Sequence, residues 1–198
     1  KDNREQIGES IALNENRTLI KPFDSQEVIA GQGTSALEAV MSIEDQDRKF
    51  DAAIVCASGG GFTAGTAIAL KAHNSNCFIY TAEPKNWNDH ELSFEANKRI
   101  FIKNKIHGIC DALESPFPGE ITFEINNRLG VKGISVDDDA IIQAMRFAYN
   151  EFNFILEPSG AIALACLMSS RSTFKGKKVL IMLSGGNISS DQFNAFIS

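Results

Sequence analysis

The chain has 198 residues, of which 43% are hydrophobic and 22% are charged, and its formal net charge is -6. This composition is that of a globular protein, and the acidic charge argues against a general binder of nucleic acid or of anionic membranes. No stretch approaches the roughly 20 apolar residues of a membrane span, and no signal-peptide pattern opens the sequence, so we expect a cytoplasmic protein.

The amino-terminal part predicts little regular structure. Residues 1–17 are polar and indicate at most a weak helix, and Thr18–Ile20 predicts a short strand. Ser35 and Glu38 have the spacing of a capping box, which predicts that a helix begins there, with residues 31–34 as its entry turn.

The centre of the chain predicts a strand, a glycine turn and a helix. Ala52–Ala57 is an apolar run without polar alternation, typical of a strand buried on both faces of a parallel sheet. The turn Ser58–Gly61 follows, and helical spacing begins at Thr63. Backbone amides and the positive end of a helix dipole meet at such a junction, which suits a phosphate group.

Two other interpretations of this turn stay open. In the first, it is a tight strand-to-helix turn that binds no ligand. In the second, Gly59, Gly61 and Ala64 form a weak dinucleotide-binding pattern, with Glu83 as the acidic residue at the end of the next strand. The spacing does not fit the phosphate loop that ends in Lys and Ser or Thr, because no such pair follows the glycines.

A second apolar strand, Cys77–Glu83, predicts a right-handed parallel crossover, so that ligands would lie at the carboxyl ends of both strands. Glu83 and Asp89, with a loop carbonyl between them, could coordinate Mg²⁺ or Ca²⁺. The alternative is that Asp89 caps a helix over His90–Lys98 and that Glu83 is only a strand-end charge. The histidines lie in polar segments, and we expect them to be exposed and structural.

The remaining sequence predicts three helices and one strand: helices over Glu120–Leu129, from a cap at Ser135 and Asp138 through Phe152, and over 161–167, and a strand over Val179–Leu183. Residues 130–133 are expected to end the helix over Glu120–Leu129. The four cysteines are far apart and without C-x-x-C spacing, so we expect buried free thiols.

Six short segments in order carry a resemblance to a known family. They are IAGQGT (29–34), SGGGFTAG (58–65), AEP (82–84), CDAL (110–113), EPSGA (157–161) and LSGGN (183–187). Together they resemble the pyridoxal-phosphate enzymes of the tryptophan-synthase-β fold type, and within them the threonine/serine dehydratase and serine racemase family. The resemblance runs from about Arg4 to Gln192.

The resemblance implies an open three-layer α/β/α fold with a mostly parallel sheet. Residues 1–28 would be the last helix and strand of a small domain, and residues 29–198 a large cofactor domain without its amino-terminal part. The phosphate-binding loop would consist of Ser58, Gly59, Gly60, Gly61 and Phe62, where Ser58 replaces the usual first glycine.

Other roles follow from the same resemblance. Ser184 would hydrogen-bond the pyridine nitrogen, and this neutral partner suits elimination and racemisation better than transamination. Glu157 would be a carboxylate near the ring. Glu83, Asp89 and the carbonyl of Trp87 match a divalent-cation site, and Ala112 stands where many relatives have Gly.

One feature of the family is not found in this sequence. The lysine that forms a Schiff base with the cofactor lies, in the family, in an S-F-K-x-R-G-like motif before GQGT, and no Lys here has that context. We therefore assign no catalytic residue within this chain and expect the chain alone to be inactive and poorly soluble.

The expected activity is pyridoxal-phosphate-dependent β-elimination of L-threonine or L-serine to a 2-oxo acid and ammonia. Serine racemase or hydroxyaspartate dehydratase activity is the alternative among enzymes. A non-catalytic binding or oligomerisation domain is the alternative from another class. The family also implies a homodimer, a small hydroxy-amino-acid substrate and no nucleic-acid or membrane partner.

Overall fold

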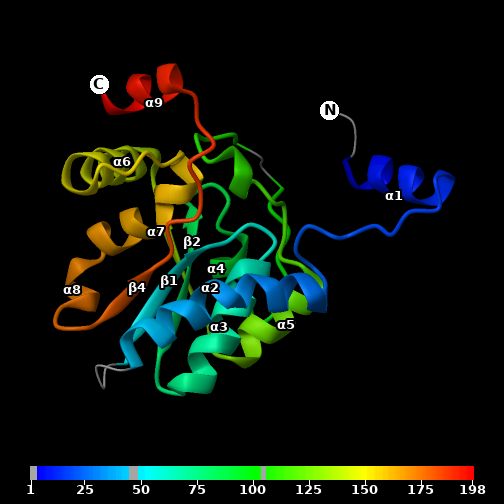
Figure 1. Cartoon of the computed structure of the whole chain (residues 1–198), viewed down its shortest axis with the longest axis horizontal. Helices are drawn as coiled ribbons and strands as arrows, with labels where there is room; N and C mark the ends of the chain where they lie inside the picture. The colour runs from blue at the N-terminus through cyan, green and yellow to red at the C-terminus, as the bar shows by residue number, and fades with distance from the viewer. Residues whose placement is uncertain (1–3, 45–48, 104–105) are drawn as a thin grey trace.

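A parallel four-stranded sheet forms the centre of the molecule (Figure 1). The computed structural model describes residues 4–44, 49–103 and 106–198. The strands are β1 (Ala52–Cys56), β2 (Phe78–Pro84), β3 (Lys132–Val136) and β4 (Val179–Ile181), in the order β3-β2-β1-β4. All the described strand pairs are parallel, so that the carboxyl ends of the strands share one edge.

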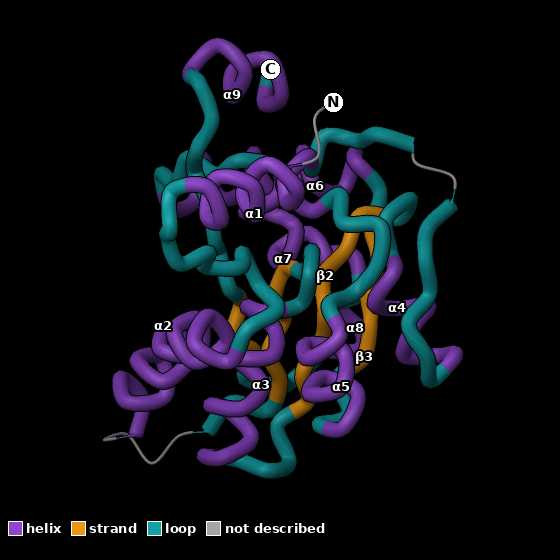
Figure 2. Tube along the Cα trace, turned by 90° about the vertical axis from the view of Figure 1, so that its right-hand side faces the viewer, coloured by secondary structure: helices purple, strands orange, loops and turns teal. Residues whose placement is uncertain are grey.

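Helices cover both faces of this sheet (Figure 2). They are α1 (Arg4–Asn14), α2 (Gln26–Glu44), α3 (Gly61–His73), α4 (Asp89–Ala96), α5 (Glu120–Arg128), α6 (Asp138–Phe152), α7 (Pro158–Ser169), α8 (Arg171–Phe174) and α9 (Ser190–Ile197), with a 3-10 turn, η1, over Asp111–Leu113. The expected three-layer α/β/α architecture is therefore confirmed. None of the described helices is long and apolar enough to cross a membrane.

The two faces of β1 explain the two halves of the core. Ala52 and Ile54 belong to the cluster formed with α6 and α7, whereas Ala53 belongs to the cluster formed with α2 and α3. This alternation follows from the two-residue period of a strand. Both faces of β1 are apolar because both are covered, as the unbroken apolar run predicts.

Helices α2 and α3 cross at two glycines. A Cβ atom added to Gly65 would lie 2.3 Å from the carbonyl oxygen of Ile29 and 2.5 Å from the amide nitrogen of Gly33. A Cβ atom on Gly33 would lie 2.8 Å from the carbonyl oxygen of Gly65. Residues 31–34 are therefore inside α2 and permit close helix packing. The predicted helix start at Ser35 is wrong, because Gln26 already begins α2.

The segment before α2 differs most from expectation. Thr18–Ile20 has no regular secondary structure, so the predicted strand is wrong, and no described strand lies beside it. Helix α1 stands apart from the sheet in Figure 1, and its Leu13 is 85% exposed. The division at residue 28 stays a prediction.

Three further elements correct the sequence-based expectations. Helix α5 ends at Arg128, as the expected break after it requires, but residues 132–136 then form β3, an unexpected strand that pairs with β2 from Tyr80 to Pro84. Helix α6 is capped by Asp137, whose carboxylate accepts from the amide of Ala140, instead of by Ser135 and Asp138. Helix α9 was not expected.

Candidate functional site

The glycine loop connects the carboxyl end of β1 to the first turn of α3. Gly60 is the N-cap residue of α3 and has a φ of 90°, a left-handed conformation that favours glycine. A Cβ atom at Gly60 would lie 2.5 Å from Cε1 of His90. Both the backbone conformation and the close contact therefore require glycine at this position.

Three successive carbonyl groups of this loop are held by side chains of α4 and α5. The carbonyl of Ser58 accepts from His90 Nε2 at 2.9 Å. That of Gly59 accepts from Thr122 Oγ1 at 2.6 Å, and that of Gly60 from Asn126 Nδ2 at 3.2 Å. These bonds fix the orientation of three peptide planes.

The orientation of the carbonyls decides where the amides point. In a trans peptide the N–H group lies opposite the preceding carbonyl, so the amides of Gly59, Gly60 and Gly61 point away from α4 and α5. In the described part of the chain, no protein atom accepts a hydrogen bond from these three amides. Three free donors at the start of a 13-residue helix form a natural anion site.

The segment that precedes α2 braces the loop from outside. A Cβ atom on Gly59 would lie 2.2 Å from the ring of Phe23, so this ring packs directly on the loop. The carboxylate of Asp24 accepts from the amides of Glu120, Ile121 and Thr122, at 3.1, 2.9 and 3.2 Å. Asp24 therefore caps α5 from a distant part of the chain and helps to place Thr122.

His90 is fully buried, which corrects the expectation of an exposed histidine. Because the Ser58 carbonyl can only accept, Nε2 of His90 carries the proton, and Nδ1 has no hydrogen-bond partner among the described residues. Burial lowers the pKa of His90 to about 4, against the opposing effect of the bond to Ser58. His90 is thus a neutral structural donor beneath the loop.

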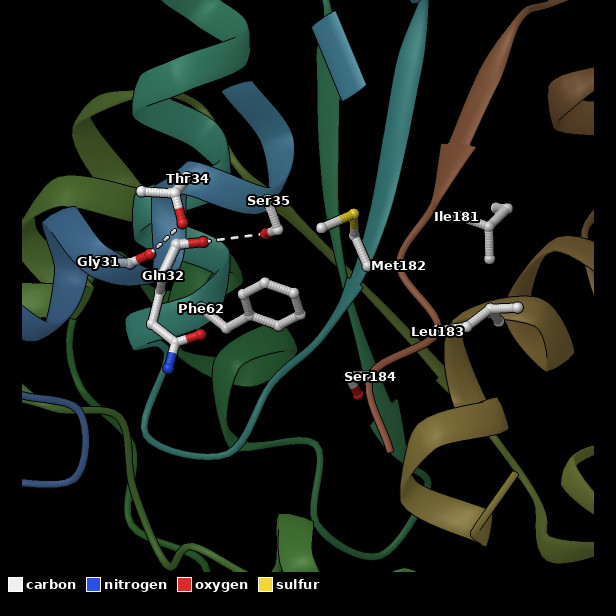
Figure 3. A pocket seen from close by; sticks show the side chains of 9 residues that line it. All are labelled: Gly31, Gln32, Thr34, Ser35, Phe62, Ile181, Met182, Leu183 and Ser184. Atoms are coloured by element: carbon white, nitrogen blue, oxygen red, sulfur yellow. Dashed lines mark hydrogen bonds between the residues drawn. The ribbon is translucent and has the colours of Figure 1, made fainter. Parts of the chain in front are cut away.

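Ser184 lies beyond the end of β4, beside the end of β1. Its Oγ is 3.1 Å from Sγ of Cys56. Ser184 and Phe62 line one pocket of about 600 Å³, together with residues of α2 and β4 (Figure 3). In Figure 3 the Phe62 ring lies between Gln32 of α2 and Met182, which follows β4. The predicted phosphate loop and the predicted ring partner are therefore neighbours.

Glu157 is held next to Ser184. It is the N-cap residue of α7, and its amide donates to the carbonyl of Gly185 at 3.1 Å. A Cβ atom on Gly185 would lie 2.1 Å from Oε1 of Glu157, so the carboxylate packs on this glycine. Burial, followed by the charge of Asp111, raises the pKa of Glu157. The loop, Ser184 and Glu157 thus meet at the carboxyl edge of the sheet.

The two carboxylates predicted to bind a cation are buried at the start of α4. Glu83 accepts from the amides of His90 at 2.7 Å and Glu91 at 2.9 Å, so Glu83 caps α4, and the predicted cap at Asp89 is wrong. One carboxylate oxygen of Asp89, Oδ2, has no hydrogen-bond partner among the described residues.

The carboxylates of Glu83 and Asp89 also interact electrostatically. Burial, followed by the negative charge of Asp89, raises the pKa of Glu83 well above its usual value. Burial raises the pKa of Asp89 to about 8. Within the described ranges no group of three or more His, Cys, Asp or Glu side chains could hold a metal, so a third protein ligand would have to be a carbonyl such as that of Trp87.

Several residues of the site were not identified from the sequence: Phe23, Asp24, Cys56, His90, Thr122 and Asn126. Thr122 and Asn126 are four residues apart and fully buried on an amphipathic helix, which is a signal that could have been noticed. The other four residues have no sequence pattern that predicts their contacts. The four cysteines are free thiols, as expected, although Cys56 is only partly buried.

Comparisons with known proteins agree with this geometry. The family model described as pyridoxal-phosphate dependent enzyme matches residues 1–185. The L-threo-3-hydroxyaspartate ammonia-lyase of a Pseudomonas species is 32% identical over 196 residues, which are 99% of this chain and 60% of that protein. The serine racemase of Schizosaccharomyces pombe is 31% identical, over 100% of this chain and 60% of that protein.

Solved structures show the same likeness. The crystal structure of T.th. threonine deaminase superposes with a TM-score of 0.90 at 29% identity, over 94% of this chain and 63% of that one. The structure of maize serine racemase superposes with a TM-score of 0.87 at 34% identity, over 98% of this chain and 58% of that one. The chain spans about 60% of the length of the curated relatives described here. It belongs to the family of pyridoxal-phosphate dependent enzymes.

Proposed function

We propose that this chain forms the cofactor-binding part of a pyridoxal-phosphate-dependent ammonia-lyase that acts on L-threonine or L-serine by β-elimination. The observation that carries the proposal is the set of three amides in the glycine loop that have no acceptor among the described residues and are fixed in direction by His90, Thr122 and Asn126. Two of the relatives, a threonine deaminase and a hydroxyaspartate ammonia-lyase, support the reaction class.

The residues present fit the cofactor. The amides of Gly59, Gly60 and Gly61 would bind its phosphate at the positive end of α3, and Phe62 would lie beside its ring. Ser184 would donate its hydroxyl proton to the ring nitrogen, with Glu157 nearby. When bound, the cofactor withdraws electrons from the α-carbon of an amino acid, which makes loss of the α-proton and of a β-hydroxyl possible.

Ser184 bears on the kind of reaction. A hydroxyl donates a hydrogen bond without adding a negative charge, so it leaves the ring nitrogen unprotonated. The weaker electron withdrawal that results favours elimination or racemisation of short hydroxy amino acids over transamination. Serine racemase or hydroxyaspartate dehydratase activity is therefore the alternative within the enzymes. A binding or oligomerisation domain without catalysis is the alternative outside them.

The first experiment is to purify the protein from cells that express its natural gene and to measure its intact mass and absorption spectrum. A Schiff-base band near ~420 nm is expected, together with ammonia and a 2-oxo acid from L-threonine or L-serine. L-threo-3-hydroxyaspartate as substrate and an assay for D-serine distinguish the alternatives within the enzymes. Bound cofactor without turnover of any of these substrates would favour the binding domain and contradict the lyase.

We also propose that Glu83 and Asp89, with the carbonyl of Trp87, bind Mg²⁺ or Ca²⁺. Two carboxylates that share a buried site cannot both ionise without a compensating charge, and a divalent cation provides one. The observation that supports the site is Oδ2 of Asp89, which is buried without a hydrogen-bond partner in the part of the chain that the structure describes. The expected ligands are hard oxygen atoms, as both cations prefer.

Thermal unfolding with and without the cation tests this site. At a cation concentration of 100 Kd, binding should stabilise the folded chain by about 2.7 kcal/mol, which corresponds to a rise in Tm of about 5–10 °C. Asp89→Asn should remove the rise, whereas the control Asp139→Asn, on the exposed start of α6, should keep it. An equal rise in Asp89→Asn would show that the cation binds elsewhere.

We further infer a division of the chain at residue 28, a homodimer and a cytoplasmic location. The division and the homodimer follow from the family resemblance, and the cytoplasmic location is the expectation from the sequence stated above. Sedimentation of the purified protein tests the assembly, because a homodimer predicts twice the mass of one chain. A monomer at micromolar concentration would contradict it.

A further inference from the structure

We propose that Cys56 is a positioning residue for Ser184: its thiol donates to the Ser184 hydroxyl and so directs the hydroxyl proton toward the ring nitrogen of the cofactor. The inference rests on the proposed function, because it needs Ser184 beside the ring. It adds a role for a thiol that the sequence indicates only as a buried free cysteine. The geometry at the ends of β1 and β4 carries the inference.

The backbone contacts between β1 and β4 end before Ser184. The register pairs Ala52 with Val179 and Ile54 with Ile181, and the last backbone bond runs from the Met182 amide to the Ile54 carbonyl at 3.1 Å. Beyond this point, the bond between Cys56 Sγ and Ser184 Oγ continues the connection between the two segments. In the described chain the Ser184 hydroxyl has no other protein partner.

The chemistry of the two groups fixes the direction of this bond once a ring nitrogen is present. A hydroxyl has one proton and two lone pairs, and an unprotonated pyridine nitrogen can only accept. Sulfur is a weak acceptor, so the Ser184 proton gains more from the ring nitrogen than from Cys56. The thiol proton then fits the free lone pair of Ser184, which gives a chain from thiol to hydroxyl to nitrogen.

The surroundings keep the thiol protonated. Burial raises the pKa of the Cys56 thiol, and the nearby carboxylate of Glu157 acts in the same direction. At neutral pH Cys56 therefore always has a proton to donate. Among the described residues no hydrogen bond joins Glu157 to the Ser184 hydroxyl, whose partner is Cys56, and the Glu157 side chain accepts from the backbone of Asn187.

Two probes separate the ring contact from the phosphate contact. Pyridoxamine 5'-phosphate carries both the ring nitrogen and the phosphate, and it cannot form a Schiff base with any lysine of the chain. Inorganic phosphate tests the glycine loop alone. Dissociation constants of both probes would be measured for wild type, Cys56→Val, Cys56→Ser, Ser184→Ala and the double variant Cys56→Val/Ser184→Ala.

Cys56→Val removes the donor at similar volume and should weaken pyridoxamine 5'-phosphate binding about fivefold, the effect of one modest hydrogen bond. Cys56→Ser should stay within about twofold of wild type, because it keeps a donor. In the Ser184→Ala background Cys56→Val should have no further effect. Phosphate binding should be unchanged in every variant. Cys77→Val is the matched control, because Cys77 is also a free thiol but bonds to the carbonyl of Phe78 instead of to Ser184.

A second readout does not depend on affinity. The ¹⁵N chemical shift of ring-labelled pyridoxamine 5'-phosphate reports the hydrogen bond to its nitrogen, and it should be the same with wild type and Cys56→Ser and should differ with Cys56→Val. If Cys56→Val weakened pyridoxamine 5'-phosphate binding equally in the wild-type and Ser184→Ala backgrounds, the inference would be overturned. It would also be overturned if Cys56→Ser bound the probe as weakly as Cys56→Val. In both cases the proposed function would still stand. A wild-type chain that binds neither probe, or phosphate only, would overturn the proposed role of the site and this inference with it.

Discussion

The two ends of the candidate cofactor site are built differently. At the glycine loop, the carbonyls of three successive residues are held by three side chains from two helices, and each of those side chains is fully buried. At the other end, Ser184 is exposed, follows an edge strand of three residues and has a single bond to a thiol. The phosphate end is therefore preorganised, whereas the ring end depends on few contacts.

Gly60→Ala should have the largest effect, because it disturbs the preorganised end. A left-handed φ costs about 1–2 kcal/mol for alanine, and the contact with His90 adds about 1–3 kcal/mol. Phosphate binding should be lost as the peptide planes rotate. The matched control is Gly130→Ala, where φ is 70° and nothing lies within 4 Å of an added Cβ.

Chemical denaturation and phosphate titration of both variants provide the measurement. Gly130→Ala should lose only about 1–2 kcal/mol and keep its phosphate affinity. If the two variants were equally destabilised and both bound phosphate, the loop would not be the rigid part of the site.

Thr122→Val should have the next largest effect on stability and on phosphate binding. It leaves the buried carbonyl of Gly59 with only the bond from the Gly119 amide at 3.1 Å, and loss of one buried partner costs about 1–3 kcal/mol. Weaker phosphate binding is expected, because the amide of Gly60 is less well fixed. Thr122→Ser keeps the hydroxyl and should restore the phosphate affinity. If Thr122→Ser did not restore the phosphate affinity, the loss in Thr122→Val would come from altered packing of the Thr122 methyl group instead of from the missing hydrogen bond.

Asp24→Ala should have a smaller effect on stability, about 1 kcal/mol, the usual loss from removal of a helix cap. Its carboxylate accepts from three amides of α5, and a neutral acceptor can replace most of these bonds. Asp24→Asn should therefore recover most of the loss in urea denaturation. A full loss in Asp24→Asn would mean that the charge at the helix terminus is the main contribution.

Ser184→Ala should have the smallest effect on stability, within about 0.5 kcal/mol, because exposed positions contribute little. Its effect should instead be on ligands that contain the pyridine ring. Thermal unfolding without ligand measures the stability. A loss greater than about 1 kcal/mol would show that the ring end is as firmly built into the fold as the loop, and the contrast between the two ends would fail.

The same contrast explains what the sequence could predict. The glycine loop and Ser184 could be singled out because short motifs carry them at the ends of apolar runs, which also predict the buried strands. Glu157, the N-cap residue of α7, was named only from the family resemblance. His90 was misjudged because its polar neighbours indicate exposure, whereas tertiary packing buries it beneath Ser58. The strand expected at Thr18–Ile20 failed because a strand needs a neighbour, which local propensity does not reveal.

The bond between Asp24 and α5 has a consequence for the order in which the chain is made. Synthesis proceeds from the amino terminus, and the segments that hold the glycine loop, from Phe23 to Asn126, leave the ribosome before Ser184 is added. The glycine loop and the side chains that hold it can therefore assemble on a nascent chain that does not yet contain β4. A phosphate group bound at that stage would stabilise the incomplete sheet by mass action. The cofactor would then assist the folding of the same protein in which it later acts.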